Sequence, residues 1–220
     1  MTTLGLITIG QTPRVDLTGE FRELLPDVRI EEAGALDGLT RPEIDALRPR
    51  HGQFLLVTRL EEGEEIAVAK EAILERLQRC IERLEPRADF LVLMCTGKFP
   101  PFQHRRLLLL PHEIVNPVVA GLVPRGRLGI IVPHETQIPW AREEFTRPGV
   151  EVIAGAASPY GAEGGLAAEA RAMAEAGAAL IYLNCFGMGL RWKRVVREAA
   201  GCPVISPVGT VCRVIDELRK

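Results

Sequence analysis

The sequence predicts an α/β protein built as two pseudo-symmetric lobes with a cleft between them, each lobe a mainly parallel four-stranded sheet flanked by helices. Three observations predict this class. Short apolar, β-branched runs alternate with longer helical patterns along the 220 residues. The strand-like runs are apolar on both faces, which is typical of parallel sheets covered on both sides. Finally, the opening "LGLITIGQTP" at 4–13 is echoed by "LGIIVPHETQIP" at 128–139.

The elements follow in order from these patterns. Strands are predicted where short β-branched or aromatic runs lie between turn residues, at 4–9, 28–33, 54–59, 90–95, 127–132, 150–154, 180–185 and 203–205. Helices are predicted where apolar residues recur every three to four positions, most clearly at 69–84, 163–176, 190–199 and 208–219. We place the boundary between lobes 1–124 and 125–220. The last helix is a candidate to cross back onto the first lobe.

The two halves are not the same length between their shared features. The openings are offset by 128 − 4 = 124 residues, whereas two cysteines that end corresponding strands are offset by 185 − 95 = 90. The first lobe should therefore carry an insertion before its cysteine strand, which we place around 61–69.

Composition excludes several classes of function. The net charge is −2 and the calculated pI is about 6.1, so no basic field favours nucleic acid or a membrane surface as a partner. The N-terminus does not resemble a signal peptide, and no apolar run approaches the ~18 residues of a membrane helix. Five cysteines without framework spacing predict reduced thiols and a cytoplasmic protein. The four histidines lack metal-ligand spacing, and no cofactor motif is present, so we expect neither a metal nor a cofactor.

The cysteines Cys95 and Cys185 are the strongest candidates for catalysis. Each ends an apolar run, in "FLVLMCTGKFP" and "ALIYLNCFGMG", and each is followed two residues later by a glycine, Gly97 or Gly187. Ligands of parallel α/β sheets bind beyond the carboxyl ends of the strands, where both thiols would lie. The glycines permit sharp turns and close approach to a ligand. A helix that begins after such a turn would offer N–H groups to a carboxylate or to a thiolate.

Two opposed thiols can invert a stereocentre without a cofactor. One, as thiolate, removes the proton next to a carboxylate, and the other, as thiol, returns a proton to the opposite face. Thr96 and Phe186, each directly after its cysteine, would line this site. The alternative is that both cysteines simply fill the core, since cysteine is among the most buried residue types.

Two loops supply candidate carboxylate-binding residues. "GQTPR" at 10–14 offers Gln11, Thr12 and Arg14, and "PHETQ" at 133–137 offers Glu135, Thr136 and Gln137. Arg14 could grip a carboxylate with two hydrogen bonds, and Arg59 is a second such candidate. The alternatives are a helix start with a solvated arginine in the first loop, and a surface position for Arg59.

The chain resembles the AroM family in "LITIGQTPR" at 6–14, "VTRLEEG" at 57–63, "LMCTGKFP" at 93–100, "GIIVPHETQ" at 129–137 and "LNCFGMG" at 183–189. That family has no settled activity. More distantly, the layout is similar to the aspartate/glutamate racemase superfamily of cofactor-independent racemases, isomerases and decarboxylases. This likeness implies that Cys95 and Cys185 are the thiols of the two lobes. The residues around them depart from the racemases' usual Cys-Asn-Thr and Gly-Cys-Thr, which makes the fold safer to transfer than the substrate.

The sequence leaves three functions open. The first is a cofactor-independent racemase, epimerase or isomerase that uses both thiols on a small carboxylate. The second is a decarboxylase or lyase that uses Cys185 alone, and the third is a non-catalytic protein that binds a small metabolite. The oligomeric state is also open, although homodimers are the commonest assemblies of soluble enzymes.

Overall fold

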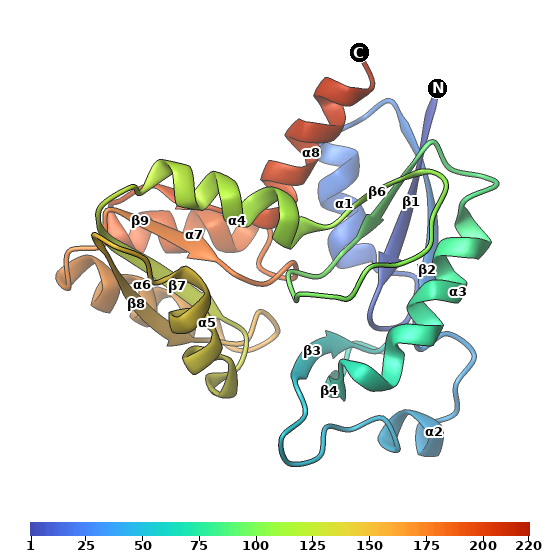
Figure 1. Ribbon diagram of the computed structural model, residues 1–220, viewed down its shortest axis with the longest axis horizontal. Helices are drawn as coiled ribbons and strands as arrows, with labels where there is room; N and C mark the ends of the chain where they lie inside the picture. The colour runs from blue at the N-terminus through green and yellow to red at the C-terminus, as the bar shows by residue number, and fades with distance from the viewer. The chain divides into compact units, whose positions relative to one another are not determined.

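The computed structural model describes residues 1–220, except for the side chain of Glu163. The chain divides into two compact units, Met1–His112 with Arg219 and Glu113–Leu218 with Lys220. Figure 1 colours the first unit from blue to green and the second from yellow-green to red. This division falls near the start of helix α4 (Pro111–Leu122), whereas the boundary expected between 124 and 125 lies after it, between α4 and strand β7 (Gly126–Val132).

The first unit contains a four-stranded parallel sheet in the order β2-β1-β5-β6. Its strands are β1 (Thr2–Thr8), β2 (Val28–Gly34), β5 (Phe90–Leu93) and β6 (Leu107–Leu109). Helix α1 (Val15–Leu24) connects β1 to β2, and α3 (Leu74–Leu84) precedes β5. The apolar faces of these strands and of α3 form one buried core, which includes Ile7, Leu77 and Leu91.

The second unit repeats this arrangement, with a parallel sheet in the order β8-β7-β9-β10. Its further strands are β8 (Val150–Ala156), β9 (Leu180–Leu183) and β10 (Val204–Ile205). The helices after α4 are α5 (Ile138–Phe145), α6 (Glu163–Glu175), α7 (Leu190–Ala200) and α8 (Pro207–Leu218), with a short 3-10 turn η2 (Glu135–Gln137). A buried core of this unit includes Ile131, Leu166 and Trp192. The predicted fold class, two α/β lobes that each contain a parallel four-stranded sheet flanked by helices, is confirmed.

The repeat extends to the pairing register of the strands. Leu4 of β1 is paired with Phe90 of β5, and Leu128 of β7 is paired with Leu180 of β9. Backbone hydrogen bonds beyond the strand ends also correspond, from Met94 N–H to Ile7 O and from Asn184 N–H to Ile131 O, both 2.8 Å long. The echo between 4–13 and 128–139 therefore reflects two equivalently built sheets.

Close packing explains the glycine of each Leu-Gly pair. A Cβ on Gly5 would lie 2.6 Å from Leu91 Cδ2 and 3.1 Å from Ala88 Cβ. At the equivalent Gly129, a Cβ would lie 3.0 Å from both Ile181 Cγ1 and Met173 Sδ. All four distances are shorter than ordinary van der Waals contacts of a Cβ atom, so each central strand needs a glycine where its neighbours pack against it.

The insertion in the first unit is larger than expected and contains a hairpin. Strands β3 (Leu55–Arg59) and β4 (Glu65–Ala69) form a separate antiparallel pair, preceded by the short helix α2 (Arg41–Asp45). The prediction that 54–59 belongs to the main sheet is wrong, since β6 is the fourth strand there. The helix expected from residue 69 begins instead with a 3-10 turn, η1 (Glu71–Ile73), which leads into α3.

The connections after the two cysteine strands differ. Residues 184–189 form a turn that leads into helix α7. Residues 94–106 run from β5 to β6 without a helix. The adjacent Pro100 and Pro101 account for this difference, because proline lacks an N–H group and disfavours helix at the residue before it. The expectation of a helix after the turn is therefore correct for Cys185 and wrong for Cys95.

The described residues contain neither a helix long and apolar enough to cross a membrane nor a group of three or more His, Cys, Asp and Glu side chains that could hold a metal ion.

Candidate functional site

Cys95 lies two residues beyond the end of β5 and is 8% exposed. The N–H group of Gly97 donates a hydrogen bond to Cys95 Sγ, with a donor–acceptor distance of 3.4 Å. A Cβ on Gly97 would lie 3.1 Å from Leu56 Cδ2 and 3.5 Å from the sulfur. The glycine therefore lets the turn fold back over the thiol and aim an amide donor at it, and such a donor stabilises a thiolate.

Cys185 lies two residues beyond the end of β9 and is also 8% exposed. Its carbonyl accepts a hydrogen bond from Met188 N–H (3.0 Å), which closes the turn before α7. A Cβ on Gly187 would lie 2.9 Å from the Tyr160 hydroxyl and 3.2 Å from Pro159 Cγ. The loop after β8 thus packs against the cysteine turn at the point where only a glycine fits.

The two cysteines occupy equivalent positions in the two sheets. Cys95 follows Phe90 by five residues, and Cys185 follows Leu180 by five. Phe90 and Leu180 are the register partners of the paired leucines Leu4 and Leu128. The match is therefore structural as well as sequential. The residues that follow the thiols, Thr96 and Phe186, are buried at 6% and 2% exposure.

Ser206 is a buried polar residue of the second unit. It lies at the end of β10, which is the neighbour of β9, directly before helix α8. Its hydroxyl is buried and has no hydrogen-bond partner among the described residues, so it does not cap the helix. A Cβ on Gly209 would lie 3.1 Å from Ser206 Oγ and 3.7 Å from Leu190 Cδ2, so this helix start adjoins the start of α7. An unpaired buried hydroxyl at two helix N-termini favours an anionic ligand.

Gln11 and Thr12 are held by contacts within the first unit. The side-chain carbonyl of Gln11 accepts a hydrogen bond from Glu61 N–H (3.1 Å), in the turn of the β3–β4 hairpin. Thr12 donates to the Asp37 carboxylate through its N–H (2.8 Å) and its hydroxyl (2.9 Å). Close packing also requires a glycine at position 10, since a Cβ there would lie 2.5 Å from Arg59 O and would also meet Thr58 Oγ1. The loop after β1 is therefore tied to the inserted hairpin.

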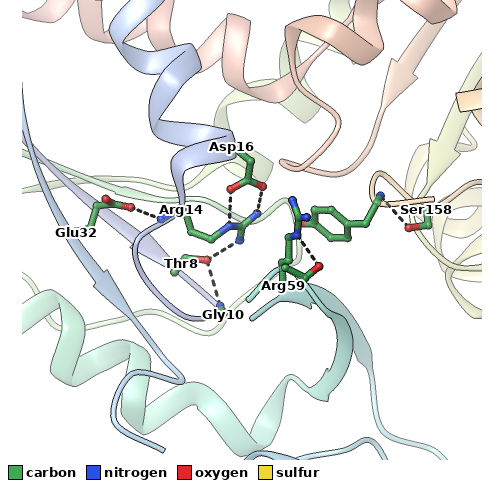
Figure 2. Close-up of polar contacts among 9 residues, drawn as sticks. Thr8, Gly10, Arg14, Asp16, Glu32, Arg59 and Ser158 are labelled. Atoms are coloured by element: carbon green, nitrogen blue, oxygen red, sulfur yellow. Dashed lines mark hydrogen bonds and ion pairs between the residues drawn. The ribbon is translucent and has the colours of Figure 1, made fainter. Parts of the chain in front are cut away.

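Arg14 is buried and bound to residues of its own unit, as Figure 2 shows. Its Nε and Nη2 donate to the two oxygens of Asp16 at 2.9 and 2.7 Å, and its Nη1 donates to Thr8 Oγ1 at 3.0 Å. Burial alone would raise the pKa of Asp16, but the hydrogen bonds and charge of Arg14, with a further contribution from Arg59, lower it below its ordinary value. Arg14 therefore forms the expected pair of hydrogen bonds to a carboxylate, but that carboxylate belongs to Asp16 of the same chain.

Arg59 ends β3, where its Nε donates to the carbonyl of Gly63 at 2.7 Å and closes the hairpin turn (Figure 2). It is partly buried, and its charge acts on Asp16. Arg14 and Arg59 thus place two guanidinium groups around one carboxylate at the carboxyl end of β1.

The corresponding loop of the second unit is partly exposed. Glu135 and Thr136 are exposed, whereas Gln137 is 7% exposed and donates its N–H to His134 O at 3.0 Å. His134 Nδ1 lies 2.9 Å from Thr136 Oγ1. These residues follow β7, and Cys185, Phe186 and Gly187 follow its neighbour β9.

Taken unit by unit, the predicted site residues gather at the carboxyl ends of adjacent parallel strands, with Arg59 at the end of the inserted hairpin strand. Asp16, Asp37, Tyr160 and Ser206 were not predicted. The first two bind predicted residues directly, and an acidic residue two positions after Arg14 was a signal for Asp16. The sequence carries no signal for Tyr160.

Comparison with solved structures finds the same fold in several enzymes. The aspartate racemase of Picrophilus torridus is 13% identical, with a TM-score of 0.59 over 99% of this chain and 94% of that one. The maleate cis-trans isomerase of Nocardia farcinica is 15% identical, with a TM-score of 0.61 over 98% and 91%. An arylmalonate decarboxylase is 15% identical, with a TM-score of 0.59 over 99% and 91%. A search of curated proteins found no match.

The sequence itself gives a more specific result. The model of the family described as AroM protein matches residues 4–219, which is nearly the whole chain. Together with the racemase-like fold, this match establishes the relationship that the motifs indicated: the chain belongs to the AroM family.

Proposed function

We propose that the protein is a cofactor-independent racemase, epimerase or isomerase that acts on a small carboxylate, with Cys95 and Cys185 as acid and base. The observation that carries this proposal is the equivalence of the two cysteines. Each stands five residues after a register-matched strand position, at the carboxyl end of a parallel strand, with a glycine two residues later. Core packing alone does not require a thiol at the same position of two sheets.

In the proposed reaction, one cysteine as thiolate takes the proton from the carbon next to the carboxylate, and the electron pair of the C–H bond stays on the substrate. The other cysteine, as thiol, gives its proton to the opposite face of that carbon. The protein ends with the proton on the first sulfur and a thiolate on the second, which is the starting state for the reverse direction. Amide donors such as Gly97 N–H support the charge on sulfur.

The carboxylate of the substrate needs its own donors. Ser206 supports an anion subsite beyond β10, the neighbour of the strand that Cys185 follows, because its buried hydroxyl is unpaired and lies at the start of α8. On this proposal, the substrate is bound by Gln11, Thr12, Arg14 and Arg59 of the first unit and by Glu135, Thr136 and Gln137 of the second. The hydrogen bonds that Gln11 and Thr12 already form hold their loop in place. For Arg14 to bind substrate directly, it would have to exchange Asp16 for the substrate carboxylate.

A one-thiol decarboxylase or lyase is the second candidate. The surroundings of the two cysteines favour it, since Cys185 is followed by a helix, whereas Cys95 is followed by a non-helical connection. In that reaction Cys185 alone would protonate the carbanion left by loss of carbon dioxide.

The two candidates are separated by cysteine variants assayed in deuterium oxide. We expect Cys95→Ala and Cys185→Ala each to abolish stereoinversion of small chiral carboxylates, read by chiral chromatography. Each variant keeps one thiol and should still exchange the α-proton of one enantiomer, read by proton NMR, with the opposite preference in the two variants.

The matched control is Cys80→Ala, which removes a buried thiol of α3 whose pKa burial raises to about 11. Retained inversion in both single variants would contradict the proposal. If Cys185→Ala loses activity and Cys95→Ala keeps it, the reaction uses Cys185 as its single thiol. Ligand-induced stabilisation without proton exchange in the wild type would identify a binding protein.

A further inference from the structure

A basic cavity in the second unit lies apart from the candidate site. It is lined by Lys193 and Arg197 of α7 and by the connection to β10, namely Gly201, Cys202, Pro203 and Val204, and its volume is about 410 Å³. These last residues lead into the N-terminal end of β10, whereas Cys185 follows the carboxyl end of the parallel strand β9. The cavity is therefore separate from the proposed reaction.

The positive charge of this cavity is not neutralised by the protein. The lining contains no carboxylate, and neither Lys193 nor Arg197 forms an ion pair with a described residue. The pKa of Lys193 is lowered by burial first, and then by the charges of Arg213 on α8 and of Arg197. Lys193 is partly buried, whereas Arg197 and Arg213 are exposed, and an anion in the cavity would offset the desolvation of the ammonium and its repulsion by the two guanidinium groups.

We propose that this cavity binds the phosphate group of a small molecule. Arginine binds phosphate oxygens in pairs, and lysine adds a compact charge, so together they suit a dianion better than a single carboxylate. The volume exceeds that of a phosphate ion and falls in the range of small-molecule sites. Pro203 and Val204 supply an apolar wall for an organic substituent.

Cys202 supplies a reporter inside the cavity, since it is partly exposed and the other four cysteines are buried. Iodoacetate is an anion and iodoacetamide is neutral, so a positive cavity raises the rate of the first relative to the second. Burial raises the pKa of the Cys202 thiol, but this slows both reagents equally and leaves their ratio unchanged.

The test measures that ratio at Cys202 by peptide mass spectrometry, relative to N-acetylcysteinamide. We expect the ratio to be about 10-fold higher in the protein. Inorganic phosphate should lower it further than sodium chloride at matched ionic strength, which lowers it only by screening. Phenyl phosphate should act at lower concentration than inorganic phosphate if the ligand carries an organic group, and equal potency assigns the site to phosphate itself.

Variants locate the effect. Lys193→Gln/Arg197→Gln should bring the ratio near that of the free thiol and remove its response to phosphate. Arg194→Gln, on the same helix but outside the lining, should preserve both. Circular dichroism checks that each variant folds.

Two results would overturn the proposal. The first is a reagent ratio at Cys202 of the wild type near that of the free thiol. The second is a decrease of the ratio in Arg194→Gln as large as in the double variant, which would mean a diffuse positive field along α7. If Cys202 resists both reagents, phosphate must raise the melting temperature of the wild type but not of the double variant, and no rise would reject the site.

Discussion

At the scale of single residues, the motif around Arg14 predicts the kind of group that this arginine binds but not which group it is. An arginine after a turn at a strand end is typical of carboxylate binding, and Arg14 does bind a carboxylate in two-oxygen fashion. The carboxylate belongs to Asp16 rather than to a ligand. The sequence could not decide between the two, because the choice depends on how the first turn of α1 places Asp16 against the guanidinium. Direct substrate binding by Arg14 stays a prediction.

We expect Asp16→Asn to destabilise the protein by about 2–3 kcal/mol at neutral pH, since it removes the negative charge that accepts two hydrogen bonds from the buried guanidinium of Arg14. The pKa of Asp16 is lowered in the folded state. Its ionised form therefore stabilises the fold above the unfolded value of about 3.9, and this contribution is lost as the pH falls through the folded pKa. The difference between the variant and the wild type should shrink at acid pH. Urea denaturation at pH 7 and at pH 3 measures it.

Glu151→Gln is the control for this prediction. It removes a carboxylate from the Arg127–Glu151 ion pair, whose side chains are 51% and 65% exposed. Exposed pairs contribute about 1 kcal/mol or less. An equal cost in both variants would contradict the argument from burial.

At the scale of elements, the sequence predicted the strands of both main sheets except β6, because buried parallel strands are apolar on both faces. It did not identify β6, since four consecutive leucines at 107–110 fit a strand and a core segment equally well. It also missed β4, whose Ala69 was assigned to the following helix. A short strand that runs directly into a helix leaves no turn residue to separate the two patterns.

Gly5→Ala should destabilise the protein by about 1–3 kcal/mol, because the added methyl group would overlap Leu91 and press on Ala88 in the core. Gly19→Ala provides the opposite case. Gly19 is an exposed residue within α1, and a Cβ there would meet nothing within 4 Å. That change should stabilise the helix by roughly 0.5–1 kcal/mol. Thermal and urea unfolding of both variants would test the pair, and equal effects would contradict the packing argument.

At the scale of the whole molecule, the repeat was visible in sequence only as two openings and two cysteines. The structure shows that strand order, register and the glycine of each Leu-Gly pair all repeat. The positions of the candidate thiols were therefore predictable from sequence. Their surroundings were not, because Thr12 binds a residue 25 positions away and Gln11 one 50 positions away. Such pairings depend on how the inserted hairpin folds back.

The glycines of the two Leu-Gly pairs contact different core clusters, Gly5 that of Leu91 and Gly129 that of Ile181, which predicts local responses to mutation. Gly5→Ala should accelerate amide exchange in β1, β2, β5 and β6 more than in β7–β10, and Gly129→Ala should do the reverse. Native-state hydrogen exchange measures both effects. Equal acceleration in both units would mean that the chain unfolds as one cooperative unit.

The unequal connections after the two cysteines have a kinetic consequence for the proposed reaction. Mirror-image substrates have equal free energies in water, so a racemase must have the same kcat/KM in both directions, however different its two thiols are. Helix α7 follows Cys185 but no helix follows Cys95. This difference can change kcat and KM between the two directions only by the same factor, and it can also give the two directions different isotope effects. A preference for one enantiomer in kcat/KM would instead identify a reaction whose substrate and product are not mirror images.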